Sequence, residues 1–139
     1  MAKSFLENLK TAKTRPQVTI IHGEPGIGKT ELLSVWPHSI FAVDDLETGI
    51  LDLQQAGSAS KEIPVVALDG YTDLMAFLEE MRVTATEYKV LVLESLNGFE
   101  RFIHEHCTAK DYNNEWGKRG FQNYQEGYKT ATQYIREFI

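Results

Sequence analysis

Residues 23–30 read Gly23-Glu24-Pro25-Gly26-Ile27-Gly28-Lys29-Thr30 and match the pattern G-x-x-x-x-G-K-[ST]. Glycines in such a run allow a tight turn that aims consecutive backbone N–H groups at phosphate oxygens. The lysine reaches the β- and γ-phosphates, and the threonine hydroxyl is a ligand for the Mg²⁺ that bridges them. The run therefore predicts a nucleoside-triphosphate site formed by residues 23–30 together with Glu31, which follows directly.

Outward from this run, strands and helices are predicted to alternate. The run lies between a β-rich segment, residues 18–22, and a segment with helical character, residues 29–35. Strands alternating with helices indicate βαβ units and a parallel sheet, so the fold class is α/β. Further strands are predicted at 39–43, 63–68 and 89–93, and further helices at 3–12, 72–81, 99–106 and 124–138, with a loop over 110–120.

A carboxylate follows the apolar run Val90-Leu91-Val92-Leu93, which predicts a strand buried on both faces. A phosphate-binding loop needs an acidic group near Mg²⁺ at the end of a neighbouring buried strand, and Glu94 occupies that position. The usual residue is Asp, and Glu is longer by one methylene. Glu94 is thus the expected Mg²⁺ partner of Thr30, and the alternative is an ordinary polar strand end. Ser95 beside it could hydrogen-bond a phosphate or the attacking water.

The strand at 39–43 also ends in acidic residues, Asp44-Asp45-Leu46-Glu47. Hydrolysis of a nucleoside triphosphate needs a residue that orients and polarises water. Asp45 and Glu47 are the candidates, and Glu47 is the first choice. The alternative is an exposed acidic turn.

Taken together, these segments resemble the core of RecA-like P-loop ATPases, in particular the short ATP-binding proteins of bacteriophages linked to single-strand annealing and recombination. Residues 88–100 are similar to that family's Walker B segment, residues 47–50 to its acidic turn, and residues 112–128 to its Gly/Lys-rich loop. The resemblance covers nearly the whole chain. It implies ATP and Mg²⁺ as cofactors, catalytic roles for Lys29, Glu47 and Glu94, single-stranded DNA as a partner, and a homo-oligomer in the host cytoplasm.

One feature departs from that family. In RecA-like cores a further strand, carrying a polar sensor, lies between the loop-bearing strand and the Walker B strand, and no segment after residue 94 reads as a strand. Adjacent strands lie ~4.8 Å apart, so its absence would leave a gap lined by unpaired backbone. Three explanations are open: the chain is a fragment, the two strands pair directly, or a second chain completes the sheet.

Composition limits the other possibilities. The 139 residues, 42% hydrophobic and with one cysteine, predict a single soluble domain, with 1–16 as a lead-in, in a reducing cytoplasm. No apolar run is long enough to span a membrane. The net charge of −6 gathers in residues 41–99, where eleven acidic groups face three basic ones, so any nucleic-acid site must be local or shared between subunits.

Four other interpretations remain open. The aromatic residues of 112–128, near Lys118 and Arg119, could stack single-stranded bases, although aromatic residues at helical spacing more often form core. His104 and His106 point about 200° apart on a helix, which disfavours a shared metal ion. The chain could be an interaction module that binds nucleotide without hydrolysing it, or a small-molecule or nucleotide kinase, although its arginines do not cluster into a lid.

Overall fold

The computed structural model describes residues 17–84, 87–116 and 121–138, so the helix predicted at 3–12 lies outside the described residues. Three strands and five helices are present in that part of the chain. They follow in the order α1 (Lys29–Ser34), β1 (Ser39–Asp44), α2 (Gly49–Ala56), β2 (Val65–Leu68), α3 (Tyr71–Thr84), β3 (Val90–Glu94), α4 (Leu96–Asp111) and α5 (Phe121–Phe138).

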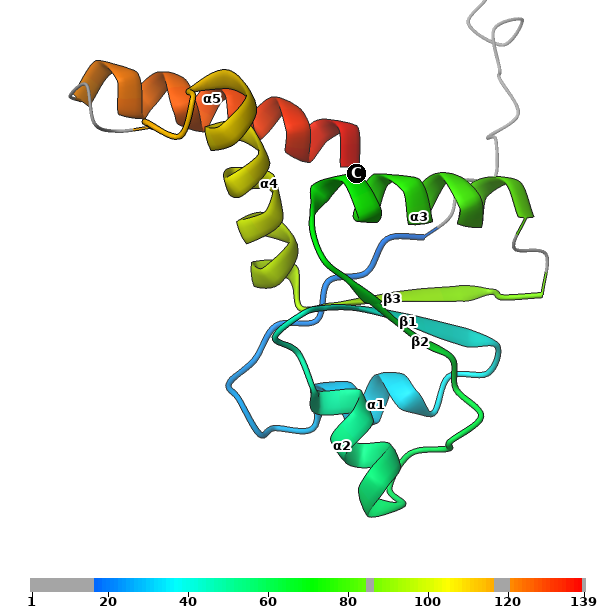
Figure 1. The fold of residues 1–139 in the computed structure, drawn as a ribbon. Helices are drawn as coiled ribbons and strands as arrows, with labels where there is room; N and C mark the ends of the chain where they lie inside the picture. Colours follow the sequence, from blue (N-terminus) through cyan, green and yellow to red (C-terminus); the bar gives the residue numbers. More distant parts are fainter. Residues whose placement is uncertain (1–16, 85–86, 117–120, 139) are drawn as a thin grey trace, which may run out of the picture.

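The three strands form a parallel sheet in the order β2-β1-β3. All six residues of β1 are buried, because β1 has a neighbour on each side and helices over both faces. Figure 1 shows α1 and α2 on one face of the sheet and α3 on the other, with α4 rising from the end of β3. The predicted α/β class with a parallel sheet flanked by helices is confirmed.

Alternating side chains of β1 supply the two layers of the core. Ala42 packs with Leu74 of α3 and Phe99 of α4 on one face. Phe41 and Val43 pack with Ile50 of α2 on the other. The two layers hold the carboxyl end of β1 between the helices that follow β1 and β3.

The strand predicted at 18–22 is wrong. Residues 17–24 have no regular secondary structure, and Val18 and Ile20 are 74% and 75% exposed. Within the described residues, β3 pairs only with β1, so its other edge has no strand beside it. A strand forms only with a partner that takes its backbone hydrogen bonds, and this segment lacks one. Direct pairing of the two strands, one of the three explanations above, is therefore also wrong.

Two further differences concern burial and helix content. β3 is mostly half-buried, with only Val92 fully enclosed, so the strand buried on both faces is β1 instead. The sequence analysis also missed α2, a short helix that places Ile50 in the core. The other strands and helices predicted within the described residues are confirmed, with shifts of a few residues at their ends.

The aromatic residues of the C-terminal part mostly join α5 to α4. Trp116 stacks on His104 with ring centroids 4.9 Å apart, and the Tyr112 hydroxyl lies 3.0 Å from that of Thr130. Ala131 of α5 is buried against Ile103 and Cys107 of α4. Core packing thus accounts for Tyr112 and Trp116, whereas Tyr128 remains 47% exposed, and the side chains of Phe121 and Tyr124 lie outside the described part of the structure. Lys118 and Arg119 lie outside the described residues.

Among the helices that the structure describes, none is both long and apolar enough to cross a membrane.

Candidate functional site

The glycine-rich loop closes onto the start of α1 through two glycines in the left-handed region. Gly26 has φ 79° and Gly28 has φ 91°, values that side-chain-bearing residues rarely adopt. The loop borders a hollow of about 280 Å³ at the carboxyl end of the sheet. The hollow is lined by Gly26, Gly28, Lys29, Thr30, Glu31, Gly49 and Leu53.

Lys29 folds back over its own loop. Its Nζ donates hydrogen bonds to the carbonyl oxygens of Gly23 at 2.9 Å and Glu24 at 2.8 Å. These bonds hold the ammonium against the backbone of its own loop, while Lys29 also contributes to the lining of the hollow. Four of the predicted loop residues do not line the hollow: Glu24, Pro25 and Ile27, which are exposed, and Gly23, which is half-buried.

Thr30 and Glu94 meet, although 64 positions separate them in the chain. The Thr30 hydroxyl donates a hydrogen bond to Oε1 of Glu94. The second oxygen, Oε2, is buried and has no hydrogen-bond partner among the described residues. Burial raises the pKa of the Glu94 carboxyl above its ordinary value, the neighbouring charge of Glu47 raises it further, and Thr30 and Lys29 act in the opposite direction.

This pair of oxygen donors fits Mg²⁺. A hard cation is held in proteins by one or two carboxylates together with hydroxyl and phosphate oxygens, and it usually keeps several waters. The unpaired Oε2 is a buried acceptor that a cation would satisfy, at a position where an unmet hydrogen bond is costly. The extra methylene of Glu94, relative to Asp, does not prevent contact with Thr30.

Glu47 approaches the same place from the turn after β1. Its Oε1 accepts a hydrogen bond from the Gly49 N–H at 2.9 Å. A Cβ on Gly49 would lie 3.0 Å from that Oε1 and 3.4 Å from Thr30 Oγ1, so this glycine lets the turn lie close against the loop. The predicted site residues Lys29, Thr30, Glu47 and Glu94 are therefore brought together.

Asp45, the other candidate for orienting water, is held elsewhere. Its carboxylate pairs with the Arg101 guanidinium of α4. The sequence analysis missed Asp44, which is 3% exposed and lies between the turn and the start of α4. The sequence carries no signal for the burial of Asp44. Its burial depends on the close approach of Gly98 in α4, which only the folded structure shows.

His104 and His106 contact different aromatic rings. His104 stacks on Trp116, and His106 lies 4.4 Å from the Tyr71 ring, centroid to centroid. In the part of the chain that the structure describes, no three His, Cys, Asp or Glu side chains gather as metal ligands would.

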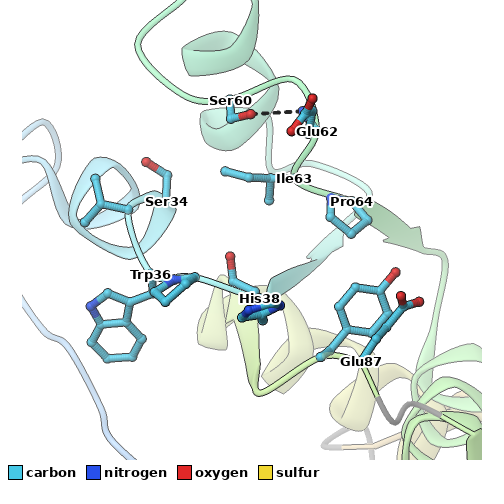
Figure 2. Close-up of a pocket in the computed structure, with 12 residues that line it drawn as sticks. Ser34, Trp36, His38, Ser60, Glu62, Ile63, Pro64 and Glu87 are labelled. Carbon is cyan, nitrogen blue, oxygen red and sulfur yellow. Dashed lines mark hydrogen bonds between the residues drawn. The ribbon is translucent and has the colours of Figure 1, made fainter.

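A second hollow, of about 470 Å³, lies at the opposite end of the sheet, before the strands begin. Figure 2 shows Trp36, His38, Glu62 and Glu87 around it. None of the predicted site residues lines it.

The chain matches a known family over most of its length, although neither the curated proteins nor the solved structures contain a match to it. The match extends over residues 15–139 and is to the AAA domain family, whose members are ATPases of the P-loop type. It agrees with the loop, the parallel sheet and the converging carboxylates described above, and it indicates a nucleotide-binding, ATPase-like function. The chain belongs to the AAA domain family.

Proposed function

We propose that the chain binds Mg²⁺-ATP in the hollow beside the glycine-rich loop and hydrolyses it. The observation that carries this proposal is the convergence of Glu94, at the end of β3, and Glu47, in the turn after β1, on Thr30 of the loop. In this assignment residues 23–31 hold the triphosphate, with Lys29 moving from its carbonyl contacts to the β- and γ-phosphates.

Two residues would hold the metal. The hydroxyl of Thr30 and the unpaired oxygen of Glu94 would contact Mg²⁺, which supplies neutralisation of phosphate charge when bound. The hydrogen bond between Thr30 and Glu94 orients both groups. Glu94 must be ionised to bind Mg²⁺. Because its pKa is raised, Mg²⁺ would compete with a proton for the carboxylate.

Glu47 would orient the attacking water. Its Oε1 is fixed by the Gly49 N–H, which leaves Oε2 as the acceptor for a water proton. Asp45 is a weaker candidate because Arg101 already pairs with its carboxylate. Measured ATP turnover in the presence and absence of Mg²⁺ tests the catalytic proposal, and a chain that binds ATP without turning it over would instead be the non-hydrolysing interaction module.

We further propose that the ATPase acts in DNA recombination or single-strand annealing, in a bacteriophage-encoded system within the host cytoplasm. Support comes from the resemblance of residues 88–100 and 47–50 to such proteins. Exposed Tyr128, beside exposed Lys129 on α5, offers one ring and one charge for a single strand. Stimulation of turnover by single-stranded DNA tests this role, and turnover that DNA leaves unchanged would contradict it.

A partner strand is the second element of the proposal. The outer edge of β3 and the exposed Val18 and Ile20 would be covered if a second chain added a strand there. Light scattering on the purified chain should then give a mass above the monomer, and Ile20→Asp should lower it. Val83→Asp, at a 66% exposed position of α3, is the matched control. A monomeric mass for the wild type as well as for Ile20→Asp would contradict the proposal.

A further inference from the structure

Asp44, a residue to which nothing above gives a role, ends β1 at the point where the two candidate catalytic segments meet. It is 3% exposed, and its carboxylate contacts groups on both sides. A buried carboxylate is unfavourable unless hydrogen bonds and opposite charge compensate for its lost hydration. The compensating groups therefore show which parts of the molecule Asp44 holds together.

One oxygen shapes the turn that carries Glu47. Oδ1 of Asp44 accepts a hydrogen bond from the Leu46 N–H at 2.9 Å, which is the geometry of an Asx turn. The backbone carbonyl of Asp44 accepts the Glu47 N–H at 3.1 Å. The path of the chain from Asp44 to Glu47 is thus fixed by two hydrogen bonds to a single residue.

The other oxygen contacts the residue that follows Glu94. Oδ2 of Asp44 accepts hydrogen bonds from the Ser95 N–H at 3.3 Å and the Ser95 hydroxyl at 3.4 Å. The sheet register places Val43 opposite Glu94, so Asp44 and Ser95 are the next residues along the two paired strands. Asp44 therefore links the end of β3 to the turn after β1.

The first turn of α4 is shaped to receive this carboxylate. A Cβ at Gly98 would lie 1.8 Å from Oδ2 of Asp44 and 2.2 Å from its carboxyl carbon. No side chain fits there, and Gly98 is itself fully buried. Arg101, one turn further along α4, lies 3.7 Å from Oδ1 of Asp44 and supplies the opposite charge.

We propose that Asp44 is a positioning residue for ATP hydrolysis: it fixes Glu47 and Glu94 relative to each other without touching nucleotide. This inference rests on the proposed function. Loss of Asp44 should displace the two carboxylates relative to the loop and leave the loop itself intact. Displacements of about 1 Å in a reacting constellation lower rates by as much as roughly a hundredfold.

The first test compares Asp44→Asn with Asp69→Asn, the same change at an exposed residue just after the neighbouring strand β2. An asparagine retains an acceptor for the Leu46 N–H but places an NH₂ donor against the Ser95 N–H. We expect Asp44→Asn to lower kcat about tenfold to a hundredfold and to leave ATP affinity in EDTA within about twofold. Asp69→Asn should match the wild type in both. An unchanged kcat in Asp44→Asn would overturn the proposal.

Gly98→Ala tests the same role without removing the Asp44 carboxylate, because the added methyl group would displace that carboxylate. In a double-mutant cycle, Gly98→Ala should lower kcat in the wild type and have little further effect in an Asp44→Ala background. Additive effects of the two changes would show that Gly98 acts independently, and would overturn the proposal. If either variant fails to fold, Arg101→Gln is used in its place. The half-buried Arg101 side chain supplies positive charge to Asp44 from outside the core, so its loss should lower kcat by a smaller factor.

Hydrogen exchange separates failure of this inference from failure of the proposed function. Asp44→Asn should accelerate amide exchange at Ser95 at least about tenfold relative to Asp69→Asn, with or without nucleotide. Unchanged exchange at Ser95, together with a wild type that hydrolyses ATP, would overturn the role of Asp44 alone. A wild type that neither binds nor hydrolyses ATP would overturn the proposed function, and the role of Asp44 in hydrolysis with it.

Discussion

Two segments that lead into the candidate site, β1 and residues 17–24, differ sharply in how they are supported. Strand β1 is buried at all six positions, and the turn after it is held by Asp44 and Gly49. Residues 17–24 lead into the glycine-rich loop without a sheet partner among the described residues, and Val18 and Ile20 face solvent. The carboxylates of the candidate site are thus anchored in the core, whereas the loop is anchored through α1 and the contacts of Thr30 and Lys29.

This difference indicates how the parts of the site depend on one another. The bond between Thr30 and Glu94 links the loop directly to the end of β3, and Leu33 of α1 packs against the core side chains of β1 and β3. Nucleotide and metal would strengthen that link, because both would contact the two sides at once. The four predictions below test this comparison.

The largest effect is expected on stability. Phe41→Ala, at a fully buried position of β1, should lower the free energy of unfolding by about 3–5 kcal/mol, because it leaves a cavity between the sheet and α2. Ile20→Ala, on the unsupported side, should change it by less than about 0.5 kcal/mol. Urea denaturation of both variants measures the difference. Equal effects would mean that residues 17–24 are packed as firmly as β1.

Glu47→Gln should lower kcat at least about a hundredfold and leave ATP affinity nearly unchanged, because glutamine accepts no proton from water. Asp45→Asn is the matched control, since Arg101 holds that carboxylate away from the loop, and its effect should be small. Steady-state phosphate release measures kcat. If Asp45→Asn proved the more damaging change, the water-orienting role would move to Asp45.

Lys29→Ala should weaken ATP binding by roughly tenfold to a hundredfold, the range for loss of a charge-assisted hydrogen bond. Lys61→Ala, an exposed lysine that contributes nothing to the lining of the loop hollow, should bind as the wild type does. Calorimetry measures both affinities. Equal affinities in the two variants would contradict the assignment of residues 23–31 to the triphosphate.

The smallest effect concerns the pH dependence of Glu94. Burial raises its folded pKa above the ordinary value of 4.5, so the folded state binds this proton more tightly than the unfolded state does. The associated stability is fully present below pH 4.5 and is lost as the pH rises through the folded pKa. At neutral pH without Mg²⁺, Glu94→Gln should therefore be as stable as the wild type or more stable, by up to about 1 kcal/mol.

Urea denaturation between pH 4 and pH 8 follows this difference. The free energy of unfolding of the wild type, minus that of Glu94→Gln, should fall as the pH rises and then level off. A difference that rises with pH would mean that the folded pKa of Glu94 is lowered, and that burial does not dominate the environment of its carboxyl group.

Local patterns in the sequence predicted the loop, β1, β3 and the meeting of their ends, because parallel strands bring their carboxyl ends to one edge. The apolar pattern of residues 18–22 predicted a strand, but pattern alone does not supply the neighbour that a strand requires. The continuous apolar run of β3 similarly suggested burial on both faces, whereas the strand order decides burial, and that order places β1 in the centre.

Asp44 could not be predicted for a related reason. Its role depends on Gly98 and Ser95, more than 50 positions later, which come within reach only when β1 and β3 pair. The choice between Asp45 and Glu47 likewise needed Arg101 of α4. Contacts that follow from the shared edge of parallel strands, such as that between Thr30 and Glu94, were predictable from the sequence, and contacts that depend on the packing of α4 were not.

The most direct test of the central claim, that Thr30 and Glu94 form the metal side of an ATP site, is calorimetric titration of ATP with and without Mg²⁺ into the wild type and Glu94→Gln. The account predicts saturable binding to the wild type that Mg²⁺ strengthens, and binding to Glu94→Gln that Mg²⁺ does not strengthen. Equal strengthening by Mg²⁺ in both proteins, or no binding to the wild type, would contradict it.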